Sequence, residues 1–171
     1  MRLRKQVELA ERFASEFLEH RKRRESIYAV ERLAQLLAQA ILDLGAMIAT
    51  YTQSVKPETY KGVAQLLAER LRLSSGDHEF LEGLAGFRNL LVHAYAEIDR
   101  SLEEEAFKEI EERVPRILER LKGYVGQLSF DPAEARDLSA VFKRHGVNYA
   151  FIYGSRAKAG IGRDYDLAVS M

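Results

Sequence analysis

Residues 29–51 read AVERLAQLLAQAILDLGAMIATY, and this stretch decides the fold class of the chain. Its large apolar residues recur at spacings of three and four, which places them on one face of a helix that advances about 100° per residue. The residues of this stripe are Val30, Leu33, Leu37, Ile41, Leu44, Ile48 and Tyr51. The pattern predicts a long helix that starts near Glu25 and buries this face against other helices.

The same periodicity continues on both sides of this stretch. Further helices are predicted over residues 3–17, 63–73, 77–94 and 101–121. Asp77 is expected to cap the fourth helix, and Ser101 followed by Glu104 is expected to form a capping box for the fifth. Pro115 lies inside the fifth helix and should kink it. Residues 1–125 are therefore predicted to form an antiparallel helical bundle.

The pattern changes in the last quarter of the chain. Asp131 followed by a proline predicts the start of a helix, and two β-rich runs follow at residues 147–153 and 165–169. The order helix, strand, Gly-Ser turn, strand is typical of the start of an α/β domain. The sequence therefore predicts a mainly α protein whose residues 126–171 form an incomplete α/β segment.

The composition excludes several classes of function. The 26 basic and 26 acidic residues give a net charge of zero, which excludes a chain-wide basic field for nucleic acid but not a local patch. The absence of cysteine excludes disulfides, thiolate metal ligands and a cysteine nucleophile. The charged N-terminus lacks the apolar segment of a signal peptide, and no uncharged apolar run reaches about 18 residues. We therefore expect a cytoplasmic protein without a membrane-spanning helix.

The predicted fourth helix carries polar residues that its apolar stripe does not explain. They are Arg88, Asn89, His93 and Tyr95. Asn89 and His93 are four residues apart and share a face, whereas Arg88 and His93 diverge by about 140° around the helix. Gly86 continues the Asn89 face, and its cost of about 1 kcal/mol in a helix is easier to understand if another helix packs there. A second protomer would bring such a helix and its own copies of the polar residues.

An arginine and a histidine in one site suggest phosphate chemistry. A histidine can transfer a proton near neutral pH, and an arginine can stabilise the charge that grows on a phosphate during transfer. Together they suffice for attack of an RNA 2′-hydroxyl on its own phosphate, which needs no metal. The alternative is a polar helix face that only solvates the bundle.

The pattern R-x-x-x-x-H-x-Y, matched by Arg88, His93 and Tyr95, resembles the signature of the HEPN superfamily. Flanking segments in the same order resemble its HepT-like branch over residues 1–125, namely 28–32, 41–45, 57–60 and 84–93. The resemblance implies an all-α homodimer and a metal-independent endoribonuclease toxin, in which Arg88 and His93 of both protomers meet in a cleft. It implies that Asn89 is a polar companion in the motif. It also implies that a partner nucleotidyltransferase adds adenylate to Tyr95 (AMPylation) and so silences the toxin.

A second motif lies in the C-terminal segment. Gly154 and Ser155 form a turn after the first β-rich run, and such a turn can offer backbone N–H groups and a hydroxyl to a triphosphate. Asp164 and Asp166 are two residues apart, so on a strand they would point the same way and could share divalent cations. The pattern resembles the minimal nucleotidyltransferase (MNT) family, the usual antitoxin partner of HepT-like proteins.

The C-terminal motif departs from the MNT pattern in two ways. Eight residues separate Ser155 from Asp164, two fewer than the family pattern usually has. The family also uses a third carboxylate on a later strand, and no such strand is present before Met171. We therefore expect a vestigial nucleotide and metal site. Mg²⁺ and ATP would matter only if this segment or a separate partner is functional.

Three functional hypotheses remain open. The leading one is an endoribonuclease toxin that needs no cofactor and carries an N-terminal part of an antitoxin-like domain. The second is a non-catalytic dimerisation module that docks a separate nucleotidyltransferase. The third is a chain that serves mainly as an AMPylation substrate through Tyr95. The retained arginine–histidine pair favours the nuclease over the docking module, but it does not distinguish an active nuclease from a modified, silenced one.

Overall fold

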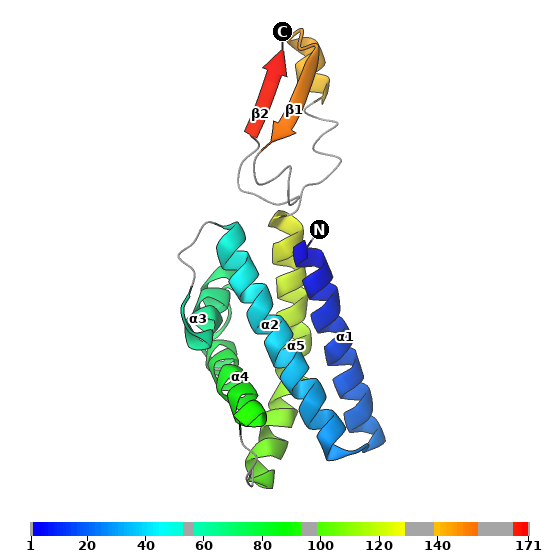
Figure 1. Ribbon diagram of the computed structural model, residues 1–171, viewed down its shortest axis with the longest axis vertical. Coiled ribbons are helices and arrows are strands. Elements are labelled where there is room, and N and C mark those ends of the chain that lie inside the picture. The colour runs from blue at the N-terminus through cyan, green and yellow to red at the C-terminus, as the bar shows by residue number, and fades with distance from the viewer. Residues whose placement is uncertain (1, 53–56, 94–98, 129–138, 154–165, 171) are drawn as a thin grey trace.

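The computed structural model describes residues 2–52, 57–93, 99–128, 139–153 and 166–170, which form a helical bundle and a small sheet (Figure 1). The helices are α1 (Arg2–Arg23), α2 (Ile27–Tyr51), α3 (Tyr60–Leu71), α4 (Ser75–His93) and α5 (Arg100–Leu128), and the strands are β1 (Tyr149–Tyr153) and β2 (Asp166–Ser170). Helix α2 is central, because it contacts α1 on one side and α3 and α4 on the other. The predicted mainly α bundle is confirmed.

The core forms where the apolar faces of the five helices meet. All five apolar positions predicted for α1 are buried, namely Leu3, Val7, Ala10, Ala14 and Phe17. Helix α2 is buried around more of its circumference than the sequence indicated, since Leu42 lies off the predicted stripe and is also fully buried. Each large apolar side chain contributes about 1.5–3 kcal/mol on burial, so α2 makes a large contribution to the stability of the bundle.

Two of the predicted helix caps are wrong. At the start of α4 the hydroxyl of Ser74 accepts a hydrogen bond from the N–H of Asp77 at 3.2 Å, so Ser74 caps the helix and Asp77 lies in its first turn. At the start of α5 the carboxylate of Asp99 accepts from the N–H of Ser101 at 2.8 Å, so Asp99 takes the place predicted for Ser101. Helix α5 then continues through Pro115 and ends beyond the predicted boundary at residue 125.

Helix α3 begins earlier than predicted because Thr59 caps it. The Thr59 side chain accepts a hydrogen bond from the N–H of Gly62 at 3.1 Å, which satisfies one of the free donors at the helix start. The helix ends at Leu71, and Arg72, which follows it, adopts a left-handed conformation. The early start makes Tyr60 the first residue of α3 and brings its ring to the side of α2 and α4.

Gly45 allows α2 and α3 to approach closely. A β-carbon at this position would lie 2.5 Å from Cγ1 of Val63 and 2.9 Å from Cδ1 of Leu67. Both neighbours belong to the buried core, so neither can move aside without disturbing its packing. The position of α3 against α2 therefore depends on the absence of a side chain at residue 45.

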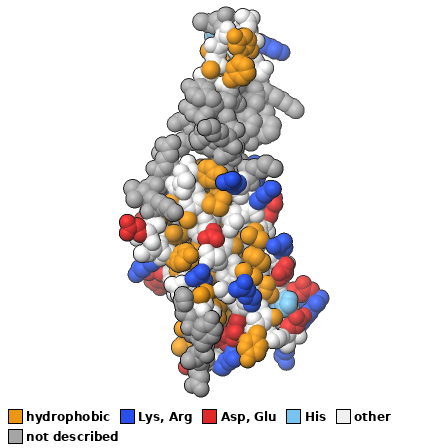
Figure 2. All heavy atoms as spheres, in the orientation of Figure 1, with side chains coloured by type: hydrophobic (Ala, Val, Ile, Leu, Met, Phe, Trp, Pro, Cys, Tyr) orange, Lys and Arg blue, Asp and Glu red, His pale blue; other side chains and the backbone are white. Residues whose placement is uncertain are grey.

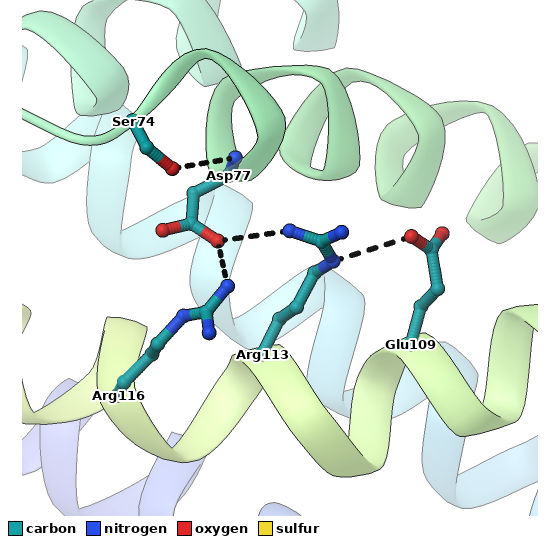
Figure 3. Close-up of polar contacts among 5 residues, drawn as sticks. All are labelled: Ser74, Asp77, Glu109, Arg113 and Arg116. Atoms are coloured by element: carbon teal, nitrogen blue, oxygen red, sulfur yellow. Dashed lines mark hydrogen bonds and ion pairs between the residues drawn. The ribbon is translucent and has the colours of Figure 1, made fainter.

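A charged cluster joins α4 to α5 (Figure 3). The Asp77 carboxylate accepts hydrogen bonds from Arg113 at 3.2 Å and from Arg116, and Arg113 also donates to Glu109 at 3.2 Å. Burial by itself raises the pKa of Asp77, but the contacts with Arg116, Ser74 and Arg113 outweigh burial and hold that pKa below its ordinary value. The cluster therefore stabilises Asp77 in its charged form.

The Asp77 cluster should make the stability of the bundle depend on acid pH. Because its pKa is lower in the folded chain, Asp77 adds stability that is present above its unfolded pKa and is lost as the pH falls through its folded pKa. Asp77→Asn should cost about 1–3 kcal/mol at pH 7, and this difference from the wild type should shrink below about pH 4. Urea denaturation at pH 7 and pH 3 measures both values.

Glu105→Gln is the matched control for this experiment, because it removes one carboxylate from the exposed face of α5. The free energy of unfolding of this variant should stay within about 0.5 kcal/mol of the wild type. A difference between Asp77→Asn and the wild type that grows on acidification would contradict the expected sign.

The described C-terminal residues form an antiparallel hairpin. Strand β1 pairs with β2 in a register that sets Tyr149 opposite Ser170, and a short helix at residues 139–144 precedes β1. Both predicted strands are therefore confirmed. Tyr149 and Phe151 contact each other edge to face with ring centres 5.5 Å apart, yet they are 59% and 62% exposed. The described residues leave this aromatic face uncovered, and the hairpin stands apart from α1 to α4 in Figure 1.

Helix α2 corrects the expectation that no segment could span a membrane. By length and composition alone it is long and apolar enough to do so, and among the described helices it alone passes this test. Asp43 divides this stretch into two shorter uncharged runs, and it is the single charged residue between residues 33 and 55. Most of that stretch is buried among the other helices, as expected for the central helix of a bundle.

Charged side chains of both signs are interspersed on the face of the bundle that Figure 2 shows. Several charged side chains of the described residues are paired across helices, for example Lys122 with Glu11 at 2.8 Å. This distribution agrees with the net charge of zero. On this face, recognition of an anionic ligand would depend on individual basic side chains rather than on a broad basic surface.

Candidate functional site

The candidate site lies on the part of α4 that faces α2 and the start of α3. Phe80 and Leu84 of α4 are buried in the core. Phe87 packs against the core and meets Phe107 of α5 edge to face, with ring centres 5.8 Å apart. These contacts fix the helix and leave Arg88 beside its packed face.

Arg88 is held by side chains from three helices. Its Nε donates to Oε1 of Gln39 on α2 at 2.8 Å, and its Nη1 donates to Oδ1 of Asn89 at 3.0 Å. Its Cζ lies 5.4 Å from the centre of the Tyr60 ring on α3, within the range of cation–π attraction. Gln39 in turn donates from Nε2 to Oδ1 of Asp43 at 2.6 Å. The guanidinium therefore has a defined position.

The hydrogen-bond partners of Arg88 differ in charge from those of most other arginines whose side-chain contacts are described. Both of its hydrogen-bond acceptors among the described residues are neutral amides. Arg21, Arg100 and Arg113 instead pair with carboxylates, which offset their charge. Within the described ranges Arg88 therefore has no carboxylate partner, and a guanidinium in such surroundings suits an anion such as a phosphate.

A groove of about 730 Å³ lies between α2, α4 and residues 57–63, and it is lined by Asn89, the residue that accepts a hydrogen bond from Arg88. Its lining includes Asp43, Tyr60, Gly86 and Asn89. A β-carbon at Gly86 would meet no atom of the described residues within 4 Å. The helix expected to pack at Gly86 is therefore not supplied by the described part of this chain, and the described residues leave this surface open to a second chain.

The structure places only part of the predicted α4 site. Arg88 and Asn89 are brought together by a hydrogen bond. His93 is the last residue of α4 and lies on the same helix as predicted, but its side chain is outside the described part of the structure. Tyr95 also lies outside the described residues. The roles of His93 and Tyr95 stay predictions.

The predicted nucleotide and metal site of the C-terminal segment is not tested either. Gly154, Ser155 and Asp164 lie outside the described residues, and of Asp166 only the backbone is described, at the start of β2. Within the described ranges, no three His, Cys, Asp or Glu side chains gather as they would to hold a metal ion.

Gln39 and Tyr60 are the site residues that the sequence did not identify. A signal for Gln39 was present, because Glu31, Gln35, Gln39 and Asp43 recur at every fourth position and form a polar line along an otherwise apolar helix. Tyr60 lay in one of the segments that carried the family resemblance, but no local pattern gave it a role.

A comparison with protein families matches residues 3–123 to the family described as ribonuclease HepT-like. A comparison with curated proteins gives no significant match. The family match covers well over half of the chain, from α1 to most of α5, and includes Arg88, Asn89 and His93. The resemblance to MNT proteins concerns residues beyond this range and stays a prediction. The chain belongs to the HepT-like ribonuclease family of the HEPN superfamily.

Proposed function

We propose that this chain is a metal-independent endoribonuclease that cleaves RNA with Arg88 and His93 and acts as a toxin in the cytoplasm. The environment of Arg88 carries the proposal, because a guanidinium that is held by neutral amides and meets no carboxylate among the described residues suits a phosphate that gains negative charge during transfer. Membership of the HepT-like ribonuclease family supports RNA as the substrate.

In the proposed reaction, the 2′-hydroxyl oxygen of RNA bonds to the adjacent phosphorus while the bond from phosphorus to the 5′-oxygen breaks. A neutral His93 imidazole accepts the hydroxyl proton, and a protonated one donates a proton to the departing 5′-oxygen. Arg88 stabilises the charge on the non-bridging oxygens, and Asn89 helps to orient Arg88. The products are a 2′,3′-cyclic phosphate and a 5′-hydroxyl, and no cofactor takes part.

We further propose that the active form is a homodimer through the α4 face that holds Gly86, Asn89 and His93. Arg88 and His93 diverge by about 140° on one helix, so two facing helices would set the arginine of each protomer near the histidine of the other. The open surface at Gly86 supports this arrangement. A stable interface would bury about 1,200 Å² or more, and sedimentation that shows only monomer at micromolar concentration would remove the composite site.

Regulation is proposed to occur at Tyr95 through a separate MNT nucleotidyltransferase that transfers adenylate from Mg-ATP. The added adenylate would bring bulk and negative charge close to the RNA path. Incubation with such a transferase should add adenylate mass at Tyr95 and lower RNA cleavage. Unchanged labelling of Tyr95→Phe would reject Tyr95 as the acceptor.

Cleavage of a defined RNA by the purified full chain in EDTA tests the proposed function. We expect cleavage at the same rate with and without EDTA, and fragments that end in a 2′,3′-cyclic phosphate. Loss of cleavage in EDTA would contradict the mechanism. Binding of RNA or of a partner without any cleavage would favour the non-catalytic docking module.

A further inference from the structure

Arg88 is held by a series of hydrogen bonds that leads through Gln39 to Asp43, both on α2. Gln39 accepts from Arg88 through Oε1 at 2.8 Å and donates through Nε2 to Asp43 at 2.6 Å. The hydroxyl of Tyr60 also lies 3.4 Å from Nε2 of Gln39. The Gln39 amide is therefore fixed in one orientation, with its oxygen toward Arg88 and its nitrogen toward Asp43.

This arrangement orients an arginine without neutralising it. A carboxylate in direct contact with Arg88 would hold the guanidinium equally well but would offset its charge, as Asp77 does for Arg113. The amide of Gln39 separates Arg88 from the Asp43 carboxylate by one side chain. Tyr60 adds a ring surface against the guanidinium and contributes no formal charge.

We infer that Gln39, backed by Asp43 and flanked by Tyr60, is a positioning residue that presents Arg88 to the scissile phosphate with its charge intact. The inference rests on the proposed ribonuclease function and deepens it. According to this inference, residue 39 must be uncharged for RNA cleavage. An amide at this position supports the reaction, and a carboxylate of the same size inhibits it.

Gln39→Glu tests this inference because it changes charge and keeps size and helix propensity. The new carboxylate should pair with Arg88, so single-turnover cleavage at saturating RNA should slow by about 10- to 100-fold, with the RNA concentration for half-maximal rate changed far less. Gln35→Glu is the matched control, since Gln35 lies one turn earlier on α2 and accepts a hydrogen bond from Arg32 at 2.9 Å. That control should cleave within about twofold of the wild type, and equal cleavage by both variants would overturn the inference.

A measurement on Arg88 itself separates failure of the inference from failure of the proposed function. In the wild-type chain the Nε proton of Arg88 should exchange slowly with water because it is hydrogen-bonded to Gln39, and Gln39→Met should accelerate this exchange. Proton exchange on ¹⁵N-labelled arginine, assigned by the signal lost in Arg88→Lys, reports it. A wild-type chain that never cleaves RNA refutes the proposed function, whereas rapid exchange in the wild type overturns the positioning role even if RNA is cleaved.

Discussion

His93→Ala is expected to reduce RNA cleavage by about 10²- to 10⁴-fold, because the variant loses the group proposed to transfer protons in the reaction. The loss should appear in the rate constant at saturating RNA rather than in RNA binding, since proton transfer contributes only in the transition state. Single-turnover cleavage of a labelled RNA in EDTA, compared with binding of a non-cleavable 2′-deoxy analogue, measures the two quantities separately.

His145→Ala is the control for this change. His145 is exposed and follows the short helix of the C-terminal segment, outside α4. The control should retain the wild-type rate within about twofold, because surface substitutions away from a site have small effects. If His93→Ala and the wild type cleave a mixed RNA pool equally, the chemistry does not occur on α4.

Phe107→Ala is expected to lower the free energy of unfolding by about 3–5 kcal/mol. The Phe107 ring is fully buried and meets Phe17 of α1 and Phe87 of α4 edge to face, with ring centres 5.7 and 5.8 Å away. Truncation would leave a cavity where α1, α4 and α5 meet, and aromatic pairing would be lost as well. Urea denaturation followed by circular dichroism measures this loss.

Leu102→Ala provides the comparison within the same helix. Leu102 is 63% exposed, so its truncation should change the free energy of unfolding by no more than about 0.5 kcal/mol. A loss below about 1 kcal/mol for Phe107→Ala would contradict this prediction. It would mean that the three helices close over the vacated space, so that little buried apolar contact is lost and no cavity remains.

The helices could be predicted from the sequence because burial imposes a spacing of three and four that is visible in one dimension. The stripe from Leu3 to Phe17 matches the buried face of α1 residue by residue. Caps were less predictable, because Ser74 and Asp77 both have suitable side chains and only the local backbone decides which one meets a free N–H. Asp77 was free to pair with arginines of α5 instead.

The sequence identified residues of the candidate site only where polar side chains interrupt the apolar pattern of a helix. Arg88 and Asn89 were identified because the apolar stripe of α4 left them over. Gln39 was missed because it meets Arg88 from 49 residues away: the polar line on α2 marks the residue, but nothing in either local segment shows that the two side chains meet.

The environment of Glu103 could likewise not be predicted from the local sequence, because it depends on a residue of another helix. It stands in a run of acidic residues, yet it is buried beside Glu31 of α2 and bonds to Arg100 at 2.7 Å. Burial and the Glu31 carboxylate raise the pKa of Glu103, while Arg100 opposes them.

The close approach of α2 and α3 at Gly45 makes the geometry around Arg88 depend on packing elsewhere in the bundle. Gly45 follows Gln39 on α2, and Val63, which Gly45 touches, lies about one turn after Tyr60 on α3. A side chain at residue 45 would push α3 outward and carry the Tyr60 ring away from Arg88. With α3 displaced, the guanidinium would lose the aromatic ring that flanks it. A side chain at residue 45 is therefore expected to weaken the proposed function of Arg88 as well as the packing of the core, although residue 45 itself lies outside the candidate site.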